Sequence, residues 1–128
     1  MNYKILILFI PLFYFFGCSV GKGPAFFNDS GGTIEIIACY EDGHRIVGSL
    51  DSGVFLWAGY LRAPISSATV TVAGISYSLG TEELRSPIPG DNWAAFVVRS
   101  DGVHKIKLSE AREMAEMAAN RKKFGKAK

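Results

Sequence analysis

The side chains best suited to acid–base or metal chemistry lie far apart along this sequence. The two histidines, His44 and His104, each follow closely on an Asp-Gly pair, and Glu41 lies near the first of them. A metal site needs three or four converging ligands, and Glu82 and Glu83 would point apart because they are neighbours on a strand or loop. The chain contains no His-x-x-x-His, Cys-x-x-Cys or Walker-type motif. We therefore expect no catalytic residue, no metal site and no cofactor.

Two segments that combine proline with aromatic and basic side chains are better candidates for recognition. One runs from Arg85 to Trp93 and holds two prolines that limit its freedom, and the other contains Tyr60 and Arg62 shortly before a proline. Aromatic and arginine side chains are the commonest anchors of protein interfaces. Arg85, Trp93, Tyr60 and Arg62 are therefore the candidate partner-binding residues. The alternative for Trp93, as for Trp57, is a place in the core.

The amino-terminal residues have the layout of a secretory signal peptide. Lys4 supplies a positive charge, an apolar run broken only by Pro11 covers residues 5–16, and Gly17 and Cys18 follow. As a helix this run would span about 18 Å, well short of a hydrocarbon core of about 30 Å. A charged start, an apolar centre and a small residue before the cleavage point are typical of a peptide removed on secretion. Residues 1–17 are thus assigned to the signal peptide and residues 18–24 to a tether.

The junction Phe15-Phe16-Gly17-Cys18 resembles the lipobox of bacterial lipoproteins, in which a small residue precedes a cysteine. The resemblance implies that Cys18 carries a diacylglyceryl thioether, that the chain is cut before it and that the new amino terminus is acylated. Three acyl chains would hold the protein firmly, since each buried methylene contributes about 0.8 kcal/mol. Ser19 resembles the signal for delivery to the outer membrane. The alternatives are a plain signal peptide or a retained amphiphilic helix.

Turn signals predict three β-hairpins between residues 33 and 108. Asp42-Gly43 and Asp101-Gly102 suit two-residue turns, because both central residues of a type I′ turn need positive φ. Ala73-Gly74 interrupts the clearest alternation of apolar and polar residues, which predicts one buried and one solvated face. The expected cross-strand pairs are Cys39 with Ile46, Val70 with Tyr77, and Val97 with Ile106.

The remaining apolar run, Val54–Ala58, lacks alternation and is typical of a central strand covered on both faces. With it the count reaches about seven strands, which predicts a small antiparallel β-sandwich or barrel over residues 25–108. Because no strand alternates with a long helix, a doubly wound parallel sheet is excluded.

Residues 109–128 are predicted to form a short C-terminal helix with a basic tail. Ser109 can cap it, and glutamates in the first turn with basic residues in the last complement the helix dipole. A narrow apolar stripe is expected to pack on the sheet over Phe96 and Val98; the alternative is a partner-binding helix. The stripe consists of Ala111, Met114, Ala115 and Ala118.

Composition and charge agree with one small domain. The chain has 128 residues and 48% apolar content, which excludes a disordered protein, and it lacks the run of about 18 apolar residues that a membrane-spanning helix needs. Residues 18–108 carry 7 basic and 9 acidic side chains, and residues 109–128 carry 6 and 3. An acidic body makes nucleic acid an unsuitable partner. Cys39 would be the one thiol left after lipidation, so it is either a small buried side chain or forms an intermolecular disulfide.

These observations predict a membrane-anchored lipoprotein that serves as a non-catalytic binding or assembly module with a protein partner in the bacterial cell envelope. An inhibitor of a foreign hydrolase or a surface-exclusion factor is the alternative among binding proteins, and it would require the loop from Arg85 to Trp93 to protrude. An envelope hydrolase is the alternative of a different class. It would require a pocket that gathers histidines or carboxylates from separate strands.

Overall fold

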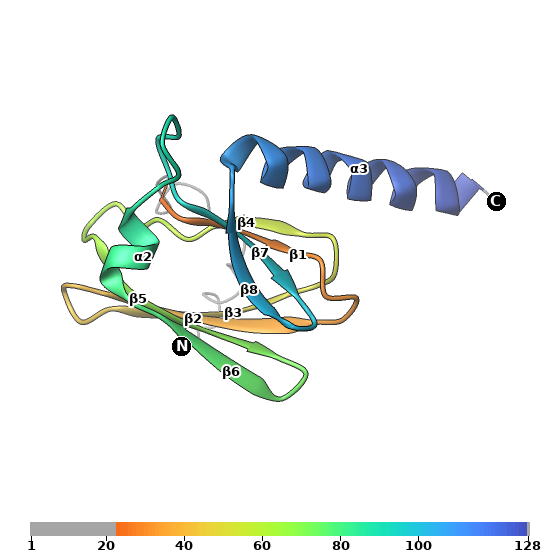
Figure 1. Cartoon of the computed structure of the whole chain (residues 1–128). Helices are drawn as coiled ribbons and strands as arrows, with labels where there is room; N and C mark the ends of the chain where they lie inside the picture. The colour runs from red at the N-terminus through yellow and green to blue at the C-terminus, as the bar shows by residue number, and fades with distance from the viewer. Residues whose placement is uncertain (1–22, 128) are drawn as a thin grey trace, which may run out of the picture.

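A computed structural model describes residues 23–127, with side chains as far as Lys122. Eight strands form two four-stranded sheets that pack face to face (Figure 1). Sheet A has the order β4-β1-β7-β8 and consists of β4 (Phe55–Trp57), β1 (Ala25–Asn28), β7 (Ala95–Arg99) and β8 (Gly102–Ile106). Sheet B has the order β3-β2-β5-β6 and consists of β3 (Arg45–Leu50), β2 (Ile34–Tyr40), β5 (Ile65–Val72) and β6 (Ile75–Leu79). Two helices follow β6 and β8, namely α2 (Thr81–Arg85) and α3 (Leu108–Ala127). The prediction of a small β-sandwich with a C-terminal helix is confirmed.

The core lies between the inner faces of the two sheets. Along β2 and β5, buried residues alternate with less buried ones, because one face of sheet B meets sheet A and the other meets solvent. Phe26 of β1 and Phe96 of β7 stack in this core with their ring centroids 5.3 Å apart. Val70 from sheet B and Leu84 from α2 are buried in the same cluster. The short helix α2, which was not expected from the sequence, thus closes one end of the core.

The hairpin formed by β5 and β6 has the predicted register. Val70 pairs with Tyr77, and Ala73 and Gly74 at the turn have φ values of 50° and 82°. Two consecutive positive φ values define the type I′ geometry that joins antiparallel strands with their natural twist. The exposed face carries a hydrogen bond of 2.9 Å between the hydroxyls of Thr71 and Ser76.

The register predicted for β2 and β3 is wrong by one residue, because Ile46 pairs with Ala38 instead of Cys39. The connection uses Glu41 as well as the Asp-Gly pair, and the Tyr40 amide donates to the His44 carbonyl at 2.9 Å. Gly43 alone in this connection has positive φ, 89°. A type I turn followed by a left-handed glycine replaces the expected two-residue turn.

The register predicted for β7 and β8 is wrong by two residues, because Val97 pairs with His104 instead of Ile106. Ser100 and Asp101 form the turn, one residue earlier than the Asp-Gly pair suggested. A shift of two leaves each side chain on its expected face, since side chains alternate with a period of two.

Sheet A is built around a strand that the sequence did not predict. All four residues of β1 are buried, and this strand pairs antiparallel with β4 and parallel with β7. The run at residues 54–58 therefore forms an edge strand, and the expectation of a central strand is wrong. Its lack of alternation has another cause: Leu56 faces the main core, while Phe55 and Trp57 pack in a second cluster with Ala111 of α3.

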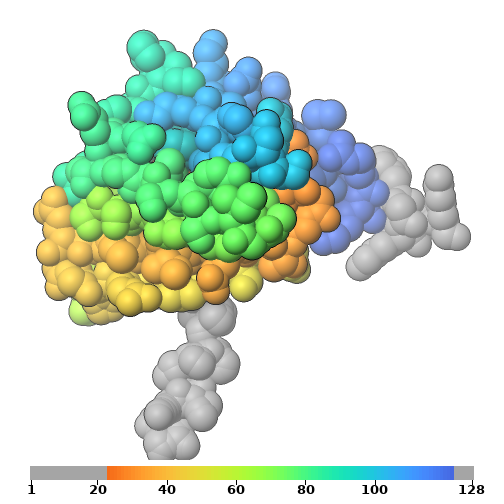
Figure 2. Space-filling model, turned by 60° about the horizontal axis from the view of Figure 1, so that its bottom comes forward, coloured from red at the N-terminus to blue at the C-terminus, as the bar shows by residue number. Residues whose placement is uncertain are grey.

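Helix α3 packs on the outer face of sheet A and extends beyond the two sheets (Figures 1 and 2). Ala111 is fully buried against Ala25 and Ala95, whose small side chains allow a close approach. The expected contact with Phe96 and Val98 is wrong, because both side chains point into the main core on the opposite face.

The beginning of α3 also differs from the prediction. Ser109 does not cap the helix, since the first helical residue is Leu108. The backbone amide of Leu108 donates to the Asp91 carboxylate at 2.8 Å. A carboxylate from the loop between α2 and β7 therefore satisfies a free amide at the positive end of the helix dipole.

Candidate functional site

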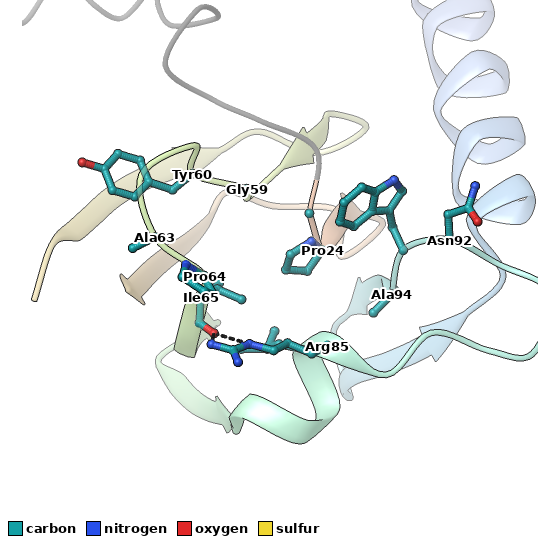
Figure 3. A pocket seen from close by; sticks show the side chains of 12 residues that line it. Pro24, Gly59, Tyr60, Ala63, Pro64, Ile65, Arg85, Asn92 and Ala94 are labelled. Atoms are coloured by element: carbon teal, nitrogen blue, oxygen red, sulfur yellow. Dashed lines mark hydrogen bonds between the residues drawn. The ribbon is translucent and has the colours of Figure 1, made fainter. Parts of the chain in front are cut away.

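Four segments far apart in the sequence meet around a cleft with a volume of about 240 Å³ (Figure 3). Gly23 and Pro24 lie just before β1, the second segment runs from Gly59 in the β4–β5 connection to Ile65 at the start of β5, and residues 92–94 precede β7. Leu84 and Arg85 of α2 complete the lining. The segments are packed closely, because a Cβ added to Gly23 would lie 2.7 Å from the Gly59 Cα. The cleft therefore has a wall that any side chain at residue 23 would displace.

Three of the four candidate partner-binding residues line this one cleft. Tyr60, Arg85 and Trp93 contribute to it, whereas Arg62 is exposed in the turn before β5 and lies outside the lining. Trp93 keeps 37% of its surface exposed, so the alternative place in the core is wrong for this residue. Trp57 is half-buried between sheet A and α3, with the Arg112 guanidinium 5.5 Å above its ring.

Arg85 acts within the fold as a structural tie. Its Nε and Nη2 atoms donate to the Ile65 carbonyl at 2.9 and 2.6 Å. Nη2 also contacts the Glu41 carboxylate at 2.6 Å, which connects α2 with the turn after β2. Because both side chains are partly exposed, the ion pair itself contributes little to stability. The guanidinium is thus already bound within the fold, and Arg85 contributes to the cleft by forming part of its wall.

Tyr60 is fixed by two rings. Its centroid lies 4.8 Å from that of Tyr40 and 4.9 Å from the His44 imidazole, which stacks on it. Figure 3 shows the Tyr60 hydroxyl directed away from the cleft. This stack could not be read from the sequence, because it joins the β2–β3 turn to a loop that follows β4.

The cleft combines an apolar interior with polar groups at its rim. Pro24, Pro64 and Leu84 supply apolar surface. Within the described part of the chain, the Trp93 indole and the Asn92 amide have no hydrogen-bond partner, so both can bind a partner's backbone. The volume lies below the range of about 300–1,000 Å³ for small-molecule sites. It suits one large apolar side chain.

The two histidines occupy separate places in the fold. His44 stacks on Tyr60, and His104 on β8 contacts the Asp101 carboxylate at 2.9 Å. The hydrogen bond from His104 is the main reason that the pKa of Asp101 lies below its usual value. Among residues 23–127, no group of three or more histidine, cysteine or acidic side chains is placed to hold a metal ion.

Tyr40 is buried beside the Tyr60 ring, and its hydroxyl donates to the Ala58 carbonyl at 2.6 Å. Burial is the main cause that raises the pKa of Tyr40 to about 12, with smaller contributions from Cys39 and Tyr60. An unfolded tyrosine ionises near pH 10, so the unfolded state binds fewer protons than the native state above that pH, and stability falls.

We expect the unfolding free energy of the wild type to fall by about 2–3 kcal/mol between pH 9.5 and 12 through this residue. Tyr40→Phe removes the ionisable group and should show a correspondingly shallower decline. Urea unfolding at several pH values measures the difference between the two proteins. Parallel curves for both would contradict the prediction.

The sequence matches no protein-family model, and comparisons with curated proteins and with solved structures give no match. None of the helices within residues 23–127 is both long and apolar enough to cross a membrane. The proposed signal peptide and Cys18 lie outside the described residues.

Proposed function

We propose that this protein is a lipoprotein of the bacterial cell envelope that binds a protein partner through the cleft at Trp93, without catalysing a reaction. The observation that carries the proposal is the exposed Trp93 beside an apolar cleft whose rim offers unpaired polar groups. Tryptophan anchors in small pockets provide much of the energy of protein interfaces. The partner is expected to insert one large apolar side chain and to bond its backbone to the Trp93 indole and the Asn92 amide.

The membrane location rests on the lipobox resemblance at Gly17 and Cys18. Gly23 and Pro24 both belong to the cleft wall, so the tether enters the domain beside the binding site. Four residues separate Cys18 from Gly23, and the five Cα–Cα steps between them extend at most about 18 Å. A cleft held this close to the bilayer favours a partner that is itself in or near the membrane.

Metabolic labelling with an alkyne analogue of palmitate tests the anchor. The wild type is expected to incorporate the label and to fractionate with membranes, whereas Cys18→Ala should lose the label because its thioether cannot form. Cys39→Ala is the matched control and should be labelled like the wild type, because Cys39 lies in β2 of the folded domain. Label retained by Cys18→Ala would overturn the lipoprotein assignment.

A further inference from the structure

The two long sides of the sandwich differ in how they are closed. Where β6 faces β8, the Tyr77 ring covers Gly102. A Cβ atom added to Gly102 would lie 3.5 Å from Tyr77 Cε1. On the opposite side a groove with a volume of about 350 Å³ separates β3 from β4. Its walls include Ile46, Leu50 and Leu56. One side of the apolar core is therefore sealed by a ring, and the other is open.

Strand β3 borders this groove and is exposed along nearly its whole length. Five of its six residues are exposed, including Ile46 at 39% and Val47 at 56%. Among the described strands only β2 pairs with it. Proteins usually protect such an edge with lysine, proline or a bulge, and the sequence Arg45–Leu50 contains no lysine or proline.

The hydrogen-bonding groups of this free edge follow from the hairpin. The His44 carbonyl accepts from the Tyr40 amide, so the backbone groups of His44 point toward β2. Because direction alternates along an antiparallel strand, the amides and carbonyls of Arg45, Val47 and Ser49 point away from β2. These groups form a template for one more strand.

We propose that a second copy of this chain occupies the edge, with the two β3 strands antiparallel about a two-fold axis through Gly48. The axis is perpendicular to sheet B, so both copies keep their cores on the same side. Arg45 then lies opposite Asp51 of the second copy on the outer face, which pairs opposite charges twice. On the inner face Ile46 lies opposite Leu50 of the second copy, at the mouth of the groove.

This register is self-complementary in both charge and hydrophobicity, as an isologous interface requires. Val47 lies opposite Ser49 of the second copy, and the pair is joined by outward-pointing backbone groups. Gly48 of one copy lies opposite Gly48 of the other, on either side of the axis. The proposal depends on the β3 edge alone and is independent of both the lipid anchor and the Trp93 cleft.

Disulfide trapping at Gly48 tests the proposed register. In a non-hydrogen-bonded antiparallel pair, the Cα atoms lie about 4.5 Å apart, within the range of about 4.4–6.8 Å for disulfides. A Cβ at Gly48 meets no atom within 4 Å, so Gly48→Cys should fold normally. The full chain carrying Cys39→Ser and Gly48→Cys, purified in mild detergent and oxidised with copper phenanthroline, should run as a disulfide-linked dimer on a non-reducing gel.

The control replaces Gly48→Cys by Ser78→Cys, which puts a thiol on the exposed edge strand β6 at the other side of sheet B. Equal dimer yields from the two chains would overturn the proposal. Adding Arg45→Asp to the Gly48→Cys chain should lower the yield severalfold, because it places like charges opposite each other. Adding Asp51→Arg as well should restore it. A yield that does not respond to Arg45→Asp would overturn the register.

Discussion

Replacement of Asn28 by aspartate is expected to lower the free energy of unfolding by about 4 kcal/mol, a large effect for an isosteric change. Asn28 is fully buried at the end of β1. Its Nδ2 atom donates to the carbonyls of Gly32 and Leu50 at 2.7 and 2.8 Å. Its Oδ1 atom accepts from the amide and the hydroxyl of Ser30 at 3.0 and 2.7 Å.

These four hydrogen bonds explain why an aspartate cannot replace the asparagine. The amide of Asn28 joins the end of sheet A to Leu50 of sheet B and shapes the turn that leads into β2. An aspartate keeps the acceptor toward Ser30 but turns a second oxygen toward two carbonyl oxygens. Both donors are then lost, and a buried charge faces two partial negative charges, which costs several kcal/mol.

Urea unfolding monitored by tryptophan fluorescence measures the effect of Asn28→Asp. Asn92→Asp is the matched control, because this amide is exposed and has no hydrogen-bond partner within the described residues. The control should stay within about 0.5 kcal/mol of the wild type. A loss below about 1 kcal/mol for Asn28→Asp would contradict the role assigned to the buried amide.

Trp93→Ala is expected to weaken binding of the partner by about 30-fold or more, which corresponds to at least about 2 kcal/mol. The substitution removes the ring at the cleft and one of its unpaired polar groups. Because Trp93 is only 37% exposed, the substitution also removes buried apolar surface and should lower stability by roughly 1–3 kcal/mol, so binding is measured at a temperature at which the variant is folded. Recovery of the partner from detergent-solubilised envelopes, followed by titration with that purified partner, measures the loss.

Met117→Ala is the control for Trp93→Ala, since Met117 is an exposed apolar side chain on α3, at 57%, outside the cleft. It should bind like the wild type. Equal binding by Trp93→Ala and the wild type would contradict the assignment of the cleft. Recovery of no partner by the wild type, together with hydrolysis of an envelope substrate, would overturn the proposed function in favour of an enzyme.

Local sequence predicted the fold where turn geometry is determined by two residues. Ala73-Gly74 set the register of β5 and β6 correctly, because both residues adopt positive φ. At residues 42–43 only Gly43 does so, and the register shifts by one. The fold class was still predicted correctly, because the alternation of apolar residues along each strand, which defines a two-faced sheet, does not depend on how the strands are paired.

Contacts that join distant segments could not be predicted in the same way. The four residues of β1 show no alternation, because they are buried on both faces by α3 and by the main core. In the cleft, the residue types were the signal, and Tyr60, Arg85 and Trp93 do lie together. The engagement of Arg85 by Ile65 and Glu41 was missed because it depends on the unpredicted helix α2.

The parallel pairing of β1 with β7 has a consequence for the order of folding. Ala25 pairs with Ala95, 70 residues further along the chain, whereas sheet B uses residues 34–79 alone. Closing a longer loop is slower and costs more entropy, so sheet B can assemble while sheet A is still incomplete. During synthesis from the amino terminus, Phe26 and Phe27 are made early and stay unpaired on one side until β7 follows. This short apolar segment is therefore where we expect a newly made chain to depend most on a chaperone.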